Sequence, residues 1–224
     1  MFVIVDDFSC FTWVLFLKEK NEALHEFSKL CKQLQIHKNL PIVSIRSDHG
    51  REFDQKVFIT FCNNFGISHK FLAPRTPQRN GVVEPKNCTL EDMARTMLSE
   101  SRLPTSFWAE AVNTGNYVVN RCLIRPILKK TPYKRFKGRK PNISYFRAFG
   151  CKCFIHNNGK ERLGKFDARS DEGILVSYSK HKKAWRVYNK HIRIIEESIR
   201  IVFYESNDGR LSYSPIPRIE TEQI

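Results

Sequence analysis

The chain has 224 residues, which is enough for one large domain or two small ones with real cores. Hydrophobic residues make up 41% of it and aromatic residues 12%, which excludes an intrinsically disordered protein. No apolar run approaches the roughly 20 residues of a membrane-spanning helix, so we expect no membrane partner. The seven cysteines show no paired spacing, which predicts reduced thiols and an intracellular protein.

The net charge of +15 is concentrated in the second half of the chain. Residues 1–100 contain 13 Lys and Arg against 12 Asp and Glu, whereas residues 101–224 contain 25 against 11. The densest stretch, Arg121 to Lys140, has nine basic residues and no acidic one. Such a stretch favours a nucleic-acid surface, because each neutralised phosphate releases a counterion. A solvated, solubilising stretch is the simpler alternative.

The first half of the chain alternates patterns typical of strands and helices, which predicts an α/β domain. Asn21 is expected to cap the first helix, and Gly66 to end the second one. The expected strands are Phe2–Val5, Phe11–Leu17, Ile42–Ile45 and Ser68–Leu72. The expected helices carry the apolar sets Leu24, Phe27, Cys31 and Leu34; Phe58, Phe61 and Phe65; Leu90, Met93, Ala94, Met97 and Leu98; and Phe107, Trp108, Ala111 and Val112.

The second half, beyond the basic stretch, has the short strands and polar turns of a small barrel or sandwich. We expect Trp108 to be a core aromatic, the alternative being a base-stacking platform. We expect Trp185 to lie in an aromatic core strand with solvated lysines around it; the alternative is binding of a nucleic-acid strand by stacking and charge. The expected strands are Cys151–Ile155, Gly173–Tyr178, Trp185–Tyr188 and Ile199–Tyr204.

Two carboxylates lie at places where a fold holds side chains in fixed positions, the end of a strand and the start of a helix. Asp48 follows the strand expected at Ile42–Ile45, and Glu84 lies near the start of the helix expected from about Val82. Paired carboxylates of this kind hold divalent metals in phosphodiester chemistry. Simpler roles are also common, since Asp favours turns and a Glu in a first helical turn favours the helix dipole. Spacing alone leaves both interpretations open.

The residues around these carboxylates form longer motifs. Asp48 lies in I-R-S-D-H-G-R-E-F (45–53), and Glu84 lies in T-P-Q-R-N-G-V-V-E-P-K-N-C-T-L-E-D-M-A-R-T-M-L (76–98). Both motifs resemble the integrase of Copia-type long-terminal-repeat retrotransposons. The resemblance continues in order, nearly to Glu205, through V-I-V-D-D-F-S (3–9), F-W-A-E-A (107–111), N-R (120–121), T-P-Y (131–133), F-G-C (149–151), K-F-D-A-R-S (165–170) and S-Y-S (177–179).

The resemblance implies a ribonuclease-H-like integrase core, lacking its first strand here, followed by a small SH3-like β-barrel module. It implies 3′-end processing and strand transfer of element DNA by an Asp, Asp, Glu triad that binds two Mg²⁺ or Mn²⁺ ions. Asp48 matches the second Asp and Glu84 the Glu, so both are expected to be catalytic and to bind metal. The expected DNA-binding residues are Gln78, Asn80, Lys86, Asn87, Arg121, Lys129 and Lys130.

The family arrangement also sets the expected domain boundaries, partners and location. The core is expected at residues 1–125, a basic connector at 126–146, the SH3-like module at 147–205 and a loose tail at 206–224. DNA, as element ends and target, is the expected partner, with a homo-oligomer as the working form and the nucleus as its location.

Several departures from the family pattern bear on activity. The first triad Asp is expected upstream of V-I-V-D-D-F-S, so we predict that this chain alone neither processes nor joins DNA ends. Pro85 and Cys88 stand where the family usually has basic residues, and Cys10 where it has Arg. The alternative function is therefore a catalytically dead, nucleic-acid-binding remnant of a decayed element. A non-integrase nuclease or transposase of the same fold fits less well, because residues 107–205 follow the Copia arrangement.

Overall fold

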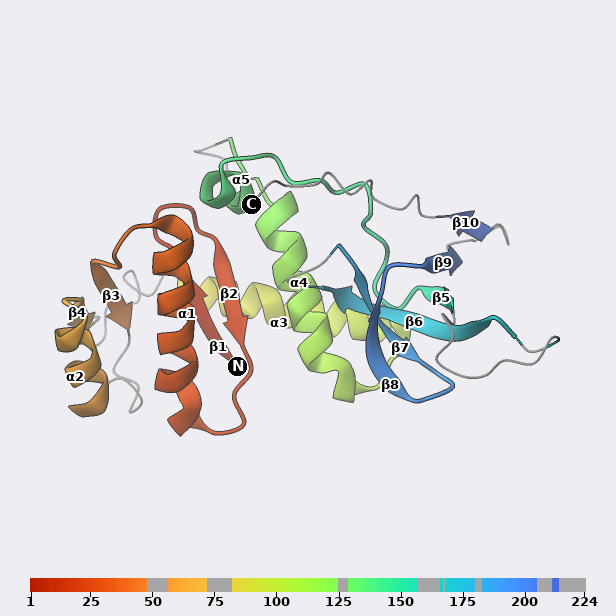
Figure 1. Ribbon diagram of the computed structural model, residues 1–224, viewed down its shortest axis with the longest axis horizontal. Helices are drawn as coiled ribbons and strands as arrows, with labels where there is room; N and C mark the ends of the chain where they lie inside the picture. The colour runs from red at the N-terminus through yellow and green to blue at the C-terminus, as the bar shows by residue number, and fades with distance from the viewer. Residues whose placement is uncertain are drawn as a thin grey trace. The chain divides into compact units, whose positions relative to one another are not determined.

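The computed structural model describes residues 1–47, 56–71, 82–124, 129–156, 166, 168–179, 183–204 and 211–213. The chain forms two compact units, Met1–Cys88 and Thr89–Ile224, which we call unit 1 and unit 2 (Figure 1). The boundary between them falls inside helix α3 (Val83–Ser101).

Unit 1 contains two strand pairs and two helices before α3. Strands β1 and β2 form an antiparallel hairpin with Phe2 opposite Leu15, whereas β3 and β4 pair in parallel. Among the described residues, these are two separate two-stranded sheets. The elements are β1 (Phe2–Val5), β2 (Thr12–Leu15), the 3₁₀ turn η1 (Lys20–Glu22), α1 (Ala23–Lys38), β3 (Ser44–Ser47), α2 (Lys56–Asn64) and β4 (Ser68–Phe71).

The core of unit 1 is built from the apolar stripes of its two helices. Phe27 of α1 contacts Phe2 of β1 edge-on, with ring centroids 6.2 Å apart, and Phe58 of α2 at 5.9 Å. Cys31 and Cys62 are buried in the same cluster, and burial raises the pKa of the Cys31 thiol to about 12. The cluster therefore links the hairpin to both helices.

The predicted elements of unit 1 are present, with differences at their ends; strand β2, for example, covers only Thr12–Leu15 of the predicted Phe11–Leu17. Asn21 does not cap α1: it lies in η1 and its amide donates to Glu19, because the 3₁₀ turn moves the start of α1 to Ala23. Strand β3 begins at Ser44, two residues after the predicted start. Gly66 follows α2 with φ +63°, a left-handed conformation that glycine adopts without strain, so the predicted helix stop is confirmed.

Unit 2 contains the rest of α3, further helices and one antiparallel sheet. Among the described residues, the sheet has six strands in the order β10-β9-β5-β6-β7-β8. The prediction missed strand β8, and β10 forms inside the segment that was expected to be loose. The elements are η3 (Thr105–Phe107), α4 (Trp108–Cys122), α5 (Pro132–Lys137), β5 (Lys152–His156), β6 (Ser170–Tyr178), β7 (Trp185–Asn189), β8 (Ile194–Ser198), β9 (Ile201–Tyr204) and β10 (Leu211–Tyr213).

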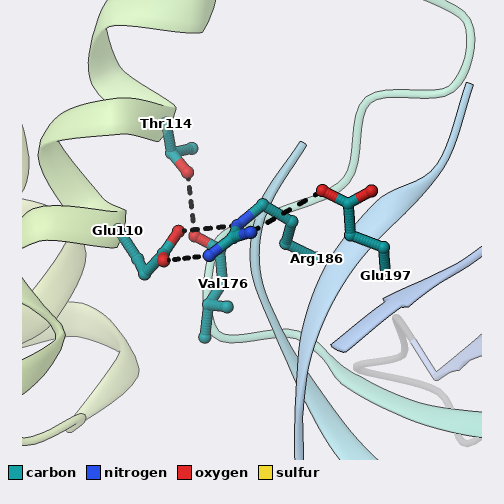
Figure 2. A network of polar contacts seen from close by, with 5 residues as sticks. All are labelled: Glu110, Thr114, Val176, Arg186 and Glu197. Atoms are coloured by element: carbon teal, nitrogen blue, oxygen red, sulfur yellow. Dashed lines mark hydrogen bonds and ion pairs between the residues drawn. The ribbon is translucent and has the colours of Figure 1, made fainter. Parts of the chain in front are cut away.

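Helix α4 packs on strand β6, and polar contacts fix its position (Figure 2). The β6–β7 register shifts between Leu175 and Ser177, so a bulge takes Val176 out of the ladder. The hydroxyl of Thr114 donates to the freed Val176 carbonyl at 2.9 Å, which satisfies a group that would otherwise be buried without a partner. The bulge therefore gives α4 a specific attachment point on the sheet.

An aromatic cluster forms the core of the sheet. Trp185 is 2% exposed, packs edge-on against Phe203 at 5.2 Å and donates its indole N–H to the Tyr145 carbonyl, so the predicted core role is confirmed. Trp108 is 46% exposed, so the prediction that it is a core aromatic is wrong. It is the first residue of α4, and the buried face of that helix is formed by other residues.

The domain boundary expected at residue 125 stays a prediction, because it comes from the family order, whereas the two compact units are defined by packing. Helix α4, which ends at Cys122, packs on the sheet of the second half. The stretch expected to be a basic connector contains α5, where Thr131 accepts a hydrogen bond from the Lys134 N–H and Gly138 ends the helix at φ +77°. None of the described helices combines the length and apolar character needed to cross a membrane.

Candidate functional site

Glu84 lies in the first turn of α3, and its side chain is exposed. The helix begins at Val83, so Pro85 is its third residue. The first-turn N–H groups of a helix have no intrahelical acceptor, so proline there removes no helical hydrogen bond. A proline biases the residue before it away from the α region, yet Glu84 is helical. The carboxylate is therefore held at the positive end of the helix dipole.

Three of the predicted site residues, Asp48, Gln78 and Asn80, lie outside the described residues. Lys86 is buried, at 6% exposure, so contact with a phosphate would require its side chain to become exposed. Asn87 is half-buried and Cys88 is exposed. Cys88 is four residues after Glu84 and so lies one helical turn further along the same face.

A hydrogen bond joins the parallel strands directly before Asp48. The Ser47 hydroxyl and the His69 Nε2 atom are 2.9 Å apart, and Ser47 is the last residue of β3. His69 packs between two rings, with centroids 5.0 Å from Phe58 and 4.3 Å from Phe71. His69 was not predicted as a site residue, because no local pattern connects residues 22 positions apart. Its contacts hold the end of β3 against β4.

We expect unit 1 to lose stability as the pH falls below about 6.5, partly through His69. Burial lowers the pKa of His69 from its usual value of 6.5, because the charged ring is desolvated. The unfolded chain then takes up the proton first. The contribution of His69 to the free energy of unfolding is therefore fully present above its pKa in the unfolded chain. It is lost as the pH falls through its lowered pKa in the folded chain.

Hydrogen exchange of the α2 and β4 amides between about pH 5 and 8, corrected for intrinsic rates, measures this loss. In the control variant His69→Gln, which cannot titrate, the pH dependence should be smaller. An identical pH dependence in both proteins would contradict the assignment to His69.

The predicted basic residues of unit 2 lie around the end of α4 and in α5. Lys129 and Lys130 are exposed and lie just before Thr131, the N-cap of α5, and α5 carries Lys134, Arg135 and Lys137. Arg139 and Lys140 follow it and are exposed as well. We call residues 129–140 the basic segment. Arg121, in the last turn of α4, is half-buried, and its guanidinium lies over the rings of Tyr117 and Tyr133.

The two predicted metal ligands suit a divalent cation chemically. Carboxylate oxygens are the donors that Mg²⁺ and Mn²⁺ prefer, and the carboxylate of Glu84 is on an exposed helical turn. In the part of the chain that the structure describes, no three His, Cys, Asp or Glu side chains are grouped to hold an ion. Asp48 is outside that part.

Two family models match separate parts of the chain, in the order that the motifs suggested. The integrase core domain matches residues 1–77, and the retroviral polymerase SH3-like domain matches residues 151–217. The first match contains Asp48, and the second contains strands β5 to β10.

The curated relatives are plant Pol polyproteins. The chain is 33% identical over 202 residues to the retrovirus-related Pol polyprotein from transposon TNT 1-94 of Nicotiana tabacum. This alignment covers 90% of this chain and 15% of that protein. It is 29% identical over 184 residues to the one from transposon RE2 of Arabidopsis thaliana, covering 82% and 12% respectively. The chain therefore spans less than a sixth of the length of these relatives.

Solved structures with a similar fold are viral integrases. The simian T-cell lymphotropic virus intasome, in complex with the PP2A regulatory subunit B56 gamma, aligns with a TM-score of 0.50 and 16% identity, covering 88% of this chain and 72% of that one. The HTLV-2 integrase catalytic core domain, in complex with magnesium, aligns with a TM-score of 0.46 and 23% identity, covering 60% and 82%. The chain thus contains an integrase core domain followed by a retroviral polymerase SH3-like domain, and over most of its length it is similar to the Pol polyproteins of plant transposons.

Proposed function

We propose that this chain acts in DNA integration, as the core and SH3-like part of a retrotransposon integrase. The observation that carries the proposal is the order of the two family matches along one chain, with the basic segment between them. DNA is the substrate class, and Lys129 and Lys130 contact its phosphates. The nucleus as location and a homo-oligomer as working form follow from the same role.

Asp48 and Glu84 are the proposed metal ligands and catalytic carboxylates. When bound by them, Mg²⁺ or Mn²⁺ would supply charge that polarises a phosphodiester oxygen. Glu84 suits this role because the first turn of α3 holds it at the surface. Gln78, Asn80 and Asn87 would position the DNA beside these carboxylates. The buried Lys86 would reach a phosphate only after its side chain becomes exposed.

The chain by itself is proposed to bind DNA without processing or joining its ends. Its 224 residues contain matches for two of the three triad carboxylates, Asp48 and Glu84. Metal loading depends on all the ligands together, so two carboxylates support it poorly.

Incubation of the purified chain with a labelled terminal duplex and Mg²⁺ or Mn²⁺ tests this proposal. We expect salt-dependent binding and no joined product. Joined product would overturn the proposed inactivity, and binding that does not weaken with salt would count against the basic segment as a phosphate surface. Supplying an upstream segment that carries the missing Asp separates an integrase from a remnant: restored joining supports the integrase, and binding without joining supports the remnant.

A further inference from the structure

Arg121 is engaged by aromatic rings on two helices. Its guanidinium carbon lies 3.3 Å from the ring centroid of Tyr117, one turn earlier on α4, and 4.7 Å from that of Tyr133 on α5. Its Nη1 atom also donates to the Tyr117 carbonyl at 3.2 Å. One planar cation thus connects the end of α4 to α5.

Tyr117 is itself held in place by the aromatic cluster of the sheet. Its ring stacks on Tyr178 with centroids 4.6 Å apart, and its hydroxyl is hydrogen-bonded to that of Tyr145. Burial raises the pKa of Tyr117, so the phenol stays protonated and neutral. Through Tyr117, the stack on Arg121 is tied to strand β6.

Helix α5 requires such an anchor. It has six residues, and an isolated helix of that length is not stable in water. Its local stabilisation comes from the Thr131 cap and from Gly138 at its C-terminus, while the buried Pro132 and the contacts of α5 with α4 attach it to the unit. A cation–π contact stabilises more strongly when the cation is shielded from water, and Arg121 is half-buried.

We propose that Arg121 is a positioning residue. Its guanidinium, in contact with the rings of Tyr117 and Tyr133, holds α5 on α4 and so presents Lys129, Lys130 and Lys134 to DNA as a preformed set. Its charge serves the stack and makes no phosphate contact of its own. The inference rests on the proposed DNA-binding function. Preforming the lysines raises affinity because less ordering is needed when DNA binds.

The test is a set of titrations of a labelled duplex with the full chain, by fluorescence anisotropy at several salt concentrations. Arg121→Lys keeps the charge but loses the planar stack, and Tyr133→Leu changes no charge. We expect each to weaken binding about tenfold, and the double variant to be no weaker than either single variant. Tyr133→Phe keeps the ring and should bind like the wild type.

Two charge-removing variants calibrate the measurement. Lys130→Gln should reduce the slope of log affinity against log salt by about 0.9, as expected for one lost phosphate contact. Lys32→Gln, on an exposed position of α1, should change neither affinity nor slope. Two results would overturn the positioning role and show a direct phosphate contact by Arg121. One is a DNA affinity of Arg121→Lys equal to that of the wild type. The other is that the losses of affinity in Arg121→Gln and Tyr133→Leu add up when the two changes are combined.

Hydrogen exchange of the free chain separates this inference from the proposed function. If Arg121 anchors α5, both Arg121→Lys and Tyr133→Leu should speed exchange in residues 133–137 without DNA. Unchanged exchange there would overturn the inference. A chain that binds no DNA would instead overturn the proposed function, and with it the role in presenting lysines, while the exchange data still decide whether Arg121 anchors α5.

Discussion

Gly150→Ala is expected to lower the free energy of unfolding of unit 2 by about 2 to 5 kcal/mol. Gly150 has φ +81°, a left-handed conformation that costs an L-residue about 1 to 2 kcal/mol. A Cβ atom at this position would also lie 2.2 Å from the Ser101 Cβ, at the end of α3. Overpacking of this kind typically costs about 1 to 3 kcal/mol.

The backbone around Gly150 has little freedom to relieve this clash. Its N–H donates to the Leu175 carbonyl of β6 at 2.8 Å, and the Leu175 N–H donates to the Cys151 carbonyl at 2.9 Å. Ser101 is also fixed, since its hydroxyl donates to the Met97 carbonyl at 2.6 Å. Alanine at position 150 must therefore displace either the end of α3 or the sheet.

Gly138→Ala is the matched control, because Gly138 has a similar φ of +77° but no atom within 4 Å of an added Cβ. It should cost only about 1 to 2 kcal/mol. Urea denaturation followed by tryptophan fluorescence gives both values. Equal losses in the two variants would contradict a clash with Ser101. Gly150→Ala combined with Ser101→Gly should be more stable than the sum of the single changes predicts.

Arg186→Met is expected to destabilise unit 2 by about 2 to 3 kcal/mol. Arg186 of β7 holds Glu110 of α4 with two hydrogen bonds, Nη2–Oε1 at 2.6 Å and Nε–Oε2 at 3.2 Å (Figure 2). The side chains of Glu110 and Arg186 are 13% and 32% exposed, so removal of the cation leaves a largely buried carboxylate without its main partner. The loss stays below that of a fully buried pair because water still reaches the arginine.

A double-mutant cycle separates this pair from its surroundings. Glu110→Leu with Arg186→Met should recover most of the loss, since replacing both partners by apolar groups removes the unpaired charge. Arg186→Lys should cost about 1 kcal/mol, because an ammonium cannot form the two-pronged contact. Glu197, 3.6 Å from Arg186 Nη1, is a weaker second partner.

Lys190→Met is the control for this cycle, as it removes an exposed lysine that pairs with Glu172 at 2.5 Å on the same sheet. Its cost should stay within about 1 kcal/mol, as for other surface pairs. Denaturation curves for the wild type, the single variant Glu110→Leu and the four variants above, read by their midpoints at constant slope, provide the comparison. A loss for Arg186→Met no larger than that for Lys190→Met would show that the α4–sheet contact does not depend on the pair.

The sequence predicted those parts of the fold that depend on near neighbours. The spacing of Phe27 and Cys31 placed both on one helical face, and both are buried in the core of unit 1. Gly66 ended α2 because its left-handed conformation suits glycine. The short strands of the second half were also readable from their composition, apart from β8 and β10. The position of Asn21 was misjudged because a 3₁₀ turn competes with a cap one residue away.

For the candidate site, too, the motifs predicted the kind of site, whereas the structure decided where the helix around Glu84 begins. Motifs around Asp48 and Glu84 indicated an integrase, and the start of α3 at Val83 agrees with a helix that presents Glu84 near its beginning. The cost of Pro85 depends only on its place in the first turn, which the helix start decides. The catalytic and DNA-binding assignments themselves remain predictions that the experiments above address.

The sequence by itself therefore determined the resemblance to integrases, the order of the two domains and most of the elements, because these follow from motifs and from spacing within a few residues. Only the tertiary structure decided which distant side chains meet: Ser47 with His69, Glu110 with Arg186, and Arg121 with Tyr133. It also decided that Gly150 lies against Ser101. Such contacts depend on packing, and no local pattern specifies the partner across the intervening residues.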